Sequence, residues 1–79
     1  MPTVLRINGF RFYFFSNEGN EPKHIHISKA DANGKMWLEP TIEPEYFYGF
    51  TNRELKEINN IVEENLELLK RAWDEYFGK

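Results

Sequence analysis

The sequence contains no cysteine among its 79 residues, and this absence excludes both disulfides and thiolate metal sites. A small domain without disulfides fits a reducing compartment. No apolar run approaches the length needed to cross a membrane, and the N-terminal residues lack the apolar core of a signal peptide. We therefore expect a soluble, cytoplasmic protein that has no membrane partner.

Several common catalytic motifs are also missing. The chain has no glycine-rich phosphate loop, no His-Glu-x-x-His zinc motif, no Gly-x-Ser-x-Gly nucleophile turn and no calcium-binding loop. A cysteine nucleophile is impossible, and neither Ser16 nor Ser28 lies in a recognisable nucleophile turn. Any catalysis must therefore use other side chains, and no cofactor is implied.

The chain also has no excess of basic residues over acidic ones. The net charge of −3 argues against simple electrostatic binding of nucleic acid. The charge is uneven, because residues 1–38 hold five basic and three acidic residues, whereas residues 39–79 hold five basic and ten acidic ones. The two halves could present opposite fields on opposite surfaces. The pattern favours the simpler interpretation, in which the acidic half is a solvated helix face.

The chain is rich in apolar residues (41%) and aromatic residues (16%), which suits one small domain over residues 1–79. Residues 1–50 read as a β-meander with its following connection. The strands that we expect are Thr3–Ile7, Phe10–Ser16, Lys23–Ser28 and Lys35–Glu39, with Glu45–Phe50 as an edge strand or an ordered connection. Asn8-Gly9 and Asn33-Gly34 predict two hairpin turns, since these residues tolerate positive φ angles.

Residues 51–78 read as one long C-terminal helix. Thr51 and Glu54 form a capping-box pattern at its start, and Gly78 is placed to end it. An apolar stripe with steps of three or four residues runs along it, made of Leu55, Ile58, Val62, Leu66, Leu69, Trp73 and Phe77. The predicted fold class is therefore α+β, a small antiparallel sheet of three to five strands packed on this helix.

Alternation along the strands predicts which side chains face the helix. The buried set is Leu5, Ile7, Phe10, Phe12, Phe14, Ile25, Ile27, Met36 and Leu38. The opposite face, which we expect to be open, carries Arg6, Arg11, Tyr13, Phe15, His24, His26, Lys35, Trp37 and Glu39. Such a face could bind RNA, with aromatic rings stacking on bases and arginines holding phosphate. Alternatively a partner protein, a second copy of the chain or the segment 39–50 covers it.

The two histidines of the chain, His24 and His26, stand two residues apart and so share one face of a strand. Such a pair can perform acid–base chemistry on RNA, deprotonating a 2′-hydroxyl and protonating a leaving oxygen without a metal. Arg11 or Arg6 then stabilises the phosphate charge. The candidate substrate-binding residues are Arg6, Tyr13, Phe15, Lys23 and Trp37.

Two other interpretations of the histidine pair stay open. His-x-His offers two imidazoles to one metal ion, whose further ligands would have to be carboxylates such as Glu39, Glu43 or Asp31. The other interpretation gives the histidines no function beyond exposure on the strand or hydrogen bonding to Tyr13 and Glu39. A bare His-x-His pattern is a weak motif, and the spacing alone selects none of these.

Segments along the whole chain resemble a small prokaryotic family, domain of unknown function 4160. They are Pro2-Thr3-Val4, residues 9–16, Glu21–His26, Trp37–Pro40, Glu63–Asn65 and Trp73–Phe77. The family has no established activity. Its members often stand beside a second small domain in toxin–antitoxin-like gene pairs. The resemblance implies a component of such a pair that acts on RNA through His24, His26 and Arg11, and that has a small antitoxin-like protein partner or self-associates. The alternatives are a non-catalytic protein-binding module and, less favoured, a metal-binding domain.

Overall fold

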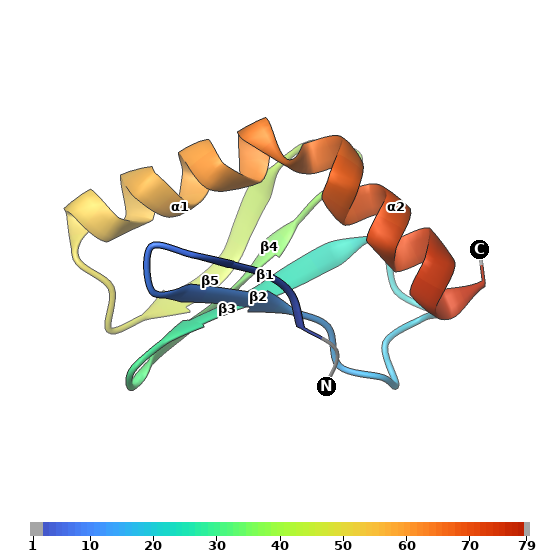
Figure 1. Cartoon of the computed structure of the whole chain (residues 1–79), viewed down its shortest axis with the longest axis horizontal. Coiled ribbons are helices and arrows are strands. Elements are labelled where there is room, and N and C mark those ends of the chain that lie inside the picture. Colours follow the sequence, from blue (N-terminus) through green and yellow to red (C-terminus); the bar gives the residue numbers. More distant parts are fainter. Residues whose placement is uncertain (1–2, 79) are drawn as a thin grey trace.

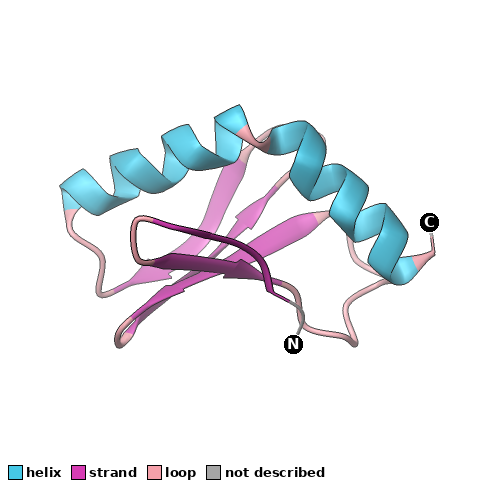
Figure 2. Cartoon of the chain, in the orientation of Figure 1, coloured by secondary structure: helices cyan, strands magenta, loops and turns pink. Residues whose placement is uncertain are grey.

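The computed structural model describes residues 3–78 and has two layers, a sheet with helices above one face (Figure 1). The strands are β1 (Thr3–Ile7), β2 (Phe10–Tyr13), β3 (His24–Lys29), β4 (Ala32–Trp37) and β5 (Glu43–Tyr48). They pair antiparallel in the order β1-β2-β3-β4-β5. Two helices follow, α1 (Asn52–Glu64) and α2 (Leu66–Phe77) (Figure 2). The predicted α+β meander is confirmed.

One of the two predicted hairpin turns forms. Asn8 and Gly9 have φ angles of 54° and 86°, as a tight turn between β1 and β2 requires. The prediction of a turn at Asn33-Gly34 is wrong, because β4 already begins at Ala32 and both residues pair within this strand. The glycine is needed there for space, since a Cβ atom at Gly34 would overlap the ring of Phe47.

The prediction of one long helix is also wrong. The helix is interrupted at Asn65, whose φ and ψ angles of −114° and 17° separate α1 from α2. The Asn65 side-chain amide donates to the Ile61 carbonyl at 2.8 Å, within the last turn of α1. Asparagine competes in this way for helix carbonyls, which favours a helix end over a continuous helix. The break turns α2 away from the line of α1 (Figure 1).

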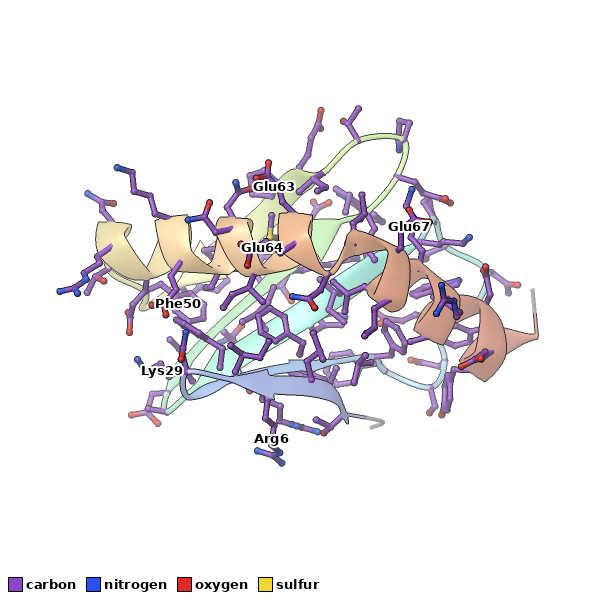
Figure 3. All side chains as sticks on the ribbon, turned by 45° about the horizontal axis from the view of Figure 1, so that its top comes forward. Arg6, Lys29, Phe50, Glu63, Glu64 and Glu67 are labelled. Carbon is purple, nitrogen blue, oxygen red and sulfur yellow. The ribbon has the colours of Figure 1, made fainter. Side chains whose placement is uncertain are left out.

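Both ends of the predicted helical region are confirmed. At the start, the Glu54 backbone N–H donates to the Thr51 hydroxyl at 3.1 Å, and the Thr51 N–H donates to the Glu54 carboxylate at 2.9 Å. This reciprocal pair satisfies two amides that the helix leaves without partners. At the other end Gly78 adopts a left-handed conformation, with φ 71°. Glu63, Glu64 and Glu67 are exposed on the helices, as expected for a solvated face (Figure 3).

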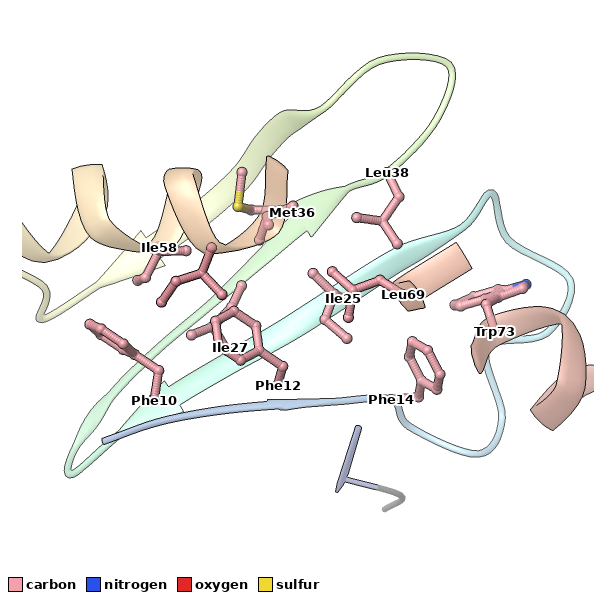
Figure 4. Packing of buried hydrophobic residues seen from close by; sticks show 12 residues of the cluster. Phe10, Phe12, Phe14, Ile25, Ile27, Met36, Leu38, Ile58, Leu69 and Trp73 are labelled. Atoms are coloured by element: carbon pink, nitrogen blue, oxygen red, sulfur yellow. The ribbon is translucent and has the colours of Figure 1, made fainter. Parts of the chain in front are cut away.

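The core lies between the sheet and the helices, and the predicted inner face is largely correct (Figure 4). Its buried members are Phe10, Phe12, Phe14, Ile25, Ile27, Met36, Leu38, Ile58, Ile61, Val62, Leu69 and Trp73. Leu5 and Ile7 on edge strand β1 are only half-buried and pack against this cluster. Within the described residues, neither helix has the length and apolar character needed to cross a bilayer.

Candidate functional site

His24 and His26 project from β3 on the side opposite the buried isoleucines Ile25 and Ile27, as the strand alternation predicts. The loop between β2 and β3 brings Glu18 to the same place. Its Oε1 atom lies 2.9 Å from the Nε2 atom of His24 and 2.9 Å from the Nε2 atom of His26. One carboxylate oxygen therefore meets both imidazoles, and we call these three residues the Glu18–His24–His26 cluster.

The expectation that the histidines are open to solvent is wrong. His24 is 0% exposed and His26 is 4% exposed. The cause is the β2–β3 loop, which places Glu18 against both rings, together with aromatic side chains that surround them. Tyr13, expected on the same open face, is also buried. The Glu18 side chain keeps 14% of its surface exposed and is the most accessible member of the cluster.

His24 has an acceptor at each ring nitrogen. Its Nδ1 atom lies 2.9 Å from the carbonyl oxygen of Pro22, while Nε2 faces Glu18. The carboxylate of Glu21 is 3.9 Å from Nδ1, on the Pro22 side. The rings of Trp37 and Trp73 meet His24 edge-on, at centroid distances of 5.4 and 4.8 Å. These contacts fix the orientation of the imidazole.

His26 lies between two aromatic side chains from β2 and the segment after it. Tyr13 stacks on the His26 ring at 5.5 Å between centroids, and Phe15 meets it edge-on at 4.5 Å. The His24 and His26 rings are themselves 5.2 Å apart and nearly perpendicular. Both Nε2 atoms therefore face Glu18, and neither imidazole is open to solvent.

The surroundings of the cluster shift the pKa values of His26 and Glu18. Burial lowers the pKa of His26, and this outweighs the opposing hydrogen bond and charge of Glu18. Burial alone would raise the pKa of Glu18, but the hydrogen bonds from His24 and His26 bring it below its ordinary value. At neutral pH we therefore expect an ionised Glu18 carboxylate and an uncharged His26 ring.

The family model of a domain of unknown function, DUF4160, matches residues 9–74. The chain belongs to the DUF4160 family. The matched region includes every residue of the Glu18–His24–His26 cluster and confirms the resemblance seen in the sequence. No curated protein and no solved structure matches the chain.

The other predicted site residues of this DUF4160 domain are distributed unevenly around the cluster. The Arg11 guanidinium lies 4.3 Å above the Tyr13 ring, and its Nε atom donates to the Thr3 hydroxyl at 2.8 Å. Phe15 touches His26 directly, and Trp37 touches His24. The structure therefore brings Tyr13, Phe15 and Trp37 into contact with the histidines, whereas Arg11 contacts Tyr13 and Thr3.

Two predicted substrate-binding residues lie apart from the cluster. Lys23 pairs with Asp74 of α2 at 2.9 Å, on the helix side of the sheet. Arg6 is exposed on β1, opposite Arg11 in the strand register, and extends away from the helices (Figure 3). Arg6 thus belongs to the same face as Arg11 without reaching the histidines.

Glu18 is the cluster residue that sequence reasoning on the DUF4160 domain missed. The carboxylates considered there as metal ligands, Glu39, Glu43 and Asp31, are not part of the cluster. Glu39 instead accepts from the Lys23 backbone N–H at 3.3 Å. The available signal was an acidic residue in the short Gly-containing connection before His24, but spacing does not reveal that this loop folds back over β3.

Proposed function

We propose that this domain is the RNA-acting component of a toxin–antitoxin-like pair, and that single-stranded RNA lies along the sheet face opposite the helices. We call this face the outer face, defined by Arg6, Arg11, Tyr13, His26, Lys35, Tyr46 and Tyr48. The observation that carries the proposal is that cationic and aromatic side chains share this face, with Arg6 and Tyr48 exposed and Tyr13 and His26 buried beneath their neighbours. Aromatic rings stack on bases regardless of sequence, and cations hold the phosphates between them.

The strand register supports this arrangement. Tyr13, His26, Lys35 and Tyr46 are successive partners across β2, β3, β4 and β5, so their side chains form one row. Tyr46 and Tyr48 stack on each other at 5.3 Å, and Tyr48 is 63% exposed. The edge of the sheet therefore presents a flat, accessible aromatic surface of the kind that bases stack on.

His26 joins the Glu18–His24–His26 cluster to this row, and the Arg11 guanidinium lies over the ring of its neighbour Tyr13. We propose that RNA bound on the outer face is acted on at this point, where a phosphodiester would meet the Arg11 guanidinium and the edge of the cluster. Lys35 is the second cation close by, and it is held by Glu21 at 3.1 Å. RNA would have to compete with Glu21 for Lys35. We therefore expect Glu21 to weaken RNA binding.

Binding is tested by fluorescence anisotropy with short labelled single-stranded RNA over a range of salt concentrations. We expect the double variant Arg6→Gln/Arg11→Gln to weaken binding and to flatten its salt dependence. The matched control is Arg53→Gln/Arg71→Gln, which removes the same charge from exposed positions on the helices. Equal losses in the two double variants would show only a nonspecific charge effect and would contradict the proposal. Glu21→Gln should increase affinity.

Action on RNA in the cell is tested by growth of a bacterial culture after induction of the protein. Arrest by the wild type, but not by a folded and equally expressed His24→Ala/His26→Ala variant, is the expected result. Sequencing of RNA ends would then locate cleavage. Equal, unimpeded growth with both proteins would argue against a toxin.

The second candidate function is a non-catalytic protein-binding module, and one observation favours it. Exposed apolar side chains are found outside the outer face as well, because Leu68 and Tyr76 on α2 are 42% and 45% exposed. An antitoxin-like partner or a second copy of the chain would bury such groups. In this case the double histidine variant keeps its partner affinity, whereas Leu68→Ser and Tyr76→Ser weaken it in a pull-down with the neighbouring gene product.

A further inference from the structure

We propose that the Glu18–His24–His26 cluster binds one divalent transition-metal ion of the zinc class, through Nε2 of each histidine and a carboxylate oxygen of Glu18. This inference goes beyond the proposed action on RNA and does not depend on it, because all three proposed metal ligands are side chains of the protein. It rests on the convergence of three ligand atoms, on the count of donors and acceptors around His24, and on the chemistry of the ligands.

The three ligand atoms converge on one point. Glu18 Oε1 is 2.9 Å from both Nε2 atoms, and all three atoms lie within 4.8 Å of one another. Zinc bonds of about 2.1 Å at tetrahedral angles place neighbouring ligand atoms about 3.4 Å apart. The ligand atoms therefore already lie near the spacing that a tetrahedral ion requires.

The hydrogen-bond count around His24 points to a cation at its Nε2 atom. The Nδ1 atom faces the Pro22 carbonyl at 2.9 Å, a contact in which only the ring nitrogen can donate. A neutral imidazole has one N–H, so its Nε2 atom then presents a lone pair to the Glu18 carboxylate, which also only accepts. Two facing acceptors repel unless a second proton or a metal ion lies between them, and the ring is completely buried.

The Pro22 carbonyl also has the position that an outer-shell hydrogen-bond partner takes beside a metal-binding histidine. A histidine that binds metal through one nitrogen nearly always donates its other N–H to a carbonyl or carboxylate, which fixes the tautomer and the ring orientation. The Pro22 carbonyl, with the Glu21 carboxylate 3.9 Å away, provides this for His24. Nε2 is thereby left as the nitrogen available to a metal ion.

The ligand set selects the class of metal. Two imidazoles and one carboxylate are the protein ligands of many zinc sites that keep a fourth position for water, whereas Mg²⁺ and Ca²⁺ prefer oxygen ligands throughout. The Trp37 and Trp73 rings beside His24 make the surroundings apolar, which strengthens the attraction between the ion and the carboxylate.

The test uses tag-free full-length protein, freed of metal with a chelator, dialysed and titrated with zinc chloride by calorimetry. Elemental analysis after gel filtration gives the stoichiometry. We expect one zinc ion per chain and a melting temperature that rises with zinc concentration. Glu18→Gln, which nearly preserves shape, should weaken zinc binding by at least the roughly 10- to 100-fold that loss of an outer-shell partner costs. Glu64→Gln is the matched control, since it removes the same charge from an exposed position on α1 outside the cluster and should bind zinc like the wild type.

A second measurement requires no variant. X-ray absorption at the zinc edge of the loaded wild type should show two imidazole ligands, and the chain has only two histidines and no cysteine. Failure of the wild type to retain stoichiometric zinc would overturn the proposal, as would a zinc site without two imidazoles or equal zinc affinity in Glu18→Gln. RNA anisotropy is measured separately with the metal-free protein. Loss of RNA binding there would leave the zinc result standing, and a negative zinc result would leave the RNA proposal standing.

Discussion

The carboxylate of Glu18 lies 2.9 Å from the Nε2 atom of His24, a ring without any exposed surface. The loop that joins β2 to β3 makes this contact, and the same carboxylate oxygen also reaches His26. A surface loop therefore supplies the polar partner for two buried rings. Its conformation and the burial of the histidines depend on each other.

This dependence predicts the effect of removing the carboxylate. In metal-free buffer, Glu18→Ala should lower the free energy of unfolding by about 1–3 kcal/mol, because two buried imidazoles lose their partner. Glu21→Ala, in the same loop but with a more exposed side chain, should cost clearly less. Urea denaturation followed by tryptophan fluorescence measures both. Equal losses would show that the contact to the histidines contributes little.

Trp73 connects the core to the cluster and should be the most sensitive position of α2. It is 1% exposed and contacts Phe14, Phe77 and His24 at centroid distances of 5.3, 4.3 and 4.8 Å. Trp73→Ala should destabilise the fold by about 3–5 kcal/mol. Tyr76→Ala, on the same helix but 45% exposed, should cost much less. Thermal denaturation ranks the two variants, and the reverse order would contradict the packing of Trp73 between the core and the cluster.

Gly34 and Phe47 should be coupled, because a Cβ atom at position 34 would overlap the Phe47 ring. Gly34→Ala should therefore cost about 1–3 kcal/mol by overpacking. In the Phe47→Ala background the same substitution should cost less, since the ring is gone and, of the nearest atoms, only the Tyr46 carbonyl oxygen at 2.9 Å remains. A double-mutant cycle by chemical denaturation measures this coupling. An equal cost in both backgrounds would assign the effect to the backbone rather than to the ring.

The capping box should make stability depend on pH. The hydrogen bond from the Thr51 backbone, aided by Lys29, lowers the pKa of Glu54 below its ordinary value of 4.5. The folded pKa is thus below the unfolded one, so the contribution of Glu54 is complete above pH 4.5 and is lost as the pH falls through the folded pKa. The stability difference between wild type and Glu54→Gln should be constant near neutral pH and shrink in acid. A difference that does not vary with pH would contradict this.

The sequence predicts the structure correctly where a pattern of neighbouring residues determines the local fold. The inner face from Phe10 to Leu38 follows from strict alternation, because each strand must bury one side against the helices. The capping box at Thr51 and the end at Gly78 follow from hydrogen bonds within a few residues. The meander order follows from short connections that leave neighbouring strands adjacent.

The missed features depend on contacts that no local pattern encodes. The loop with Glu18 folds back over β3, which makes the His24 face buried rather than open. Asn65 suits a helix interior poorly, yet the apolar stripe continues across it, so periodicity alone predicted one helix. Asn33-Gly34 has the composition of a turn, but the ring of Phe47 uses the glycine as space within a strand.

The meander order of the sheet has a consequence for how the domain folds. Each strand pairs with the strand next to it in sequence, so every pairing closes a short loop and loses little chain entropy. We expect the sheet to assemble early, with the Glu18–His24–His26 residues already near one another on consecutive segments. The helices come from the end of the chain, and Trp73 reaches His24 only when α2 docks. The last side of the cluster to close during folding is therefore the one that faces α2.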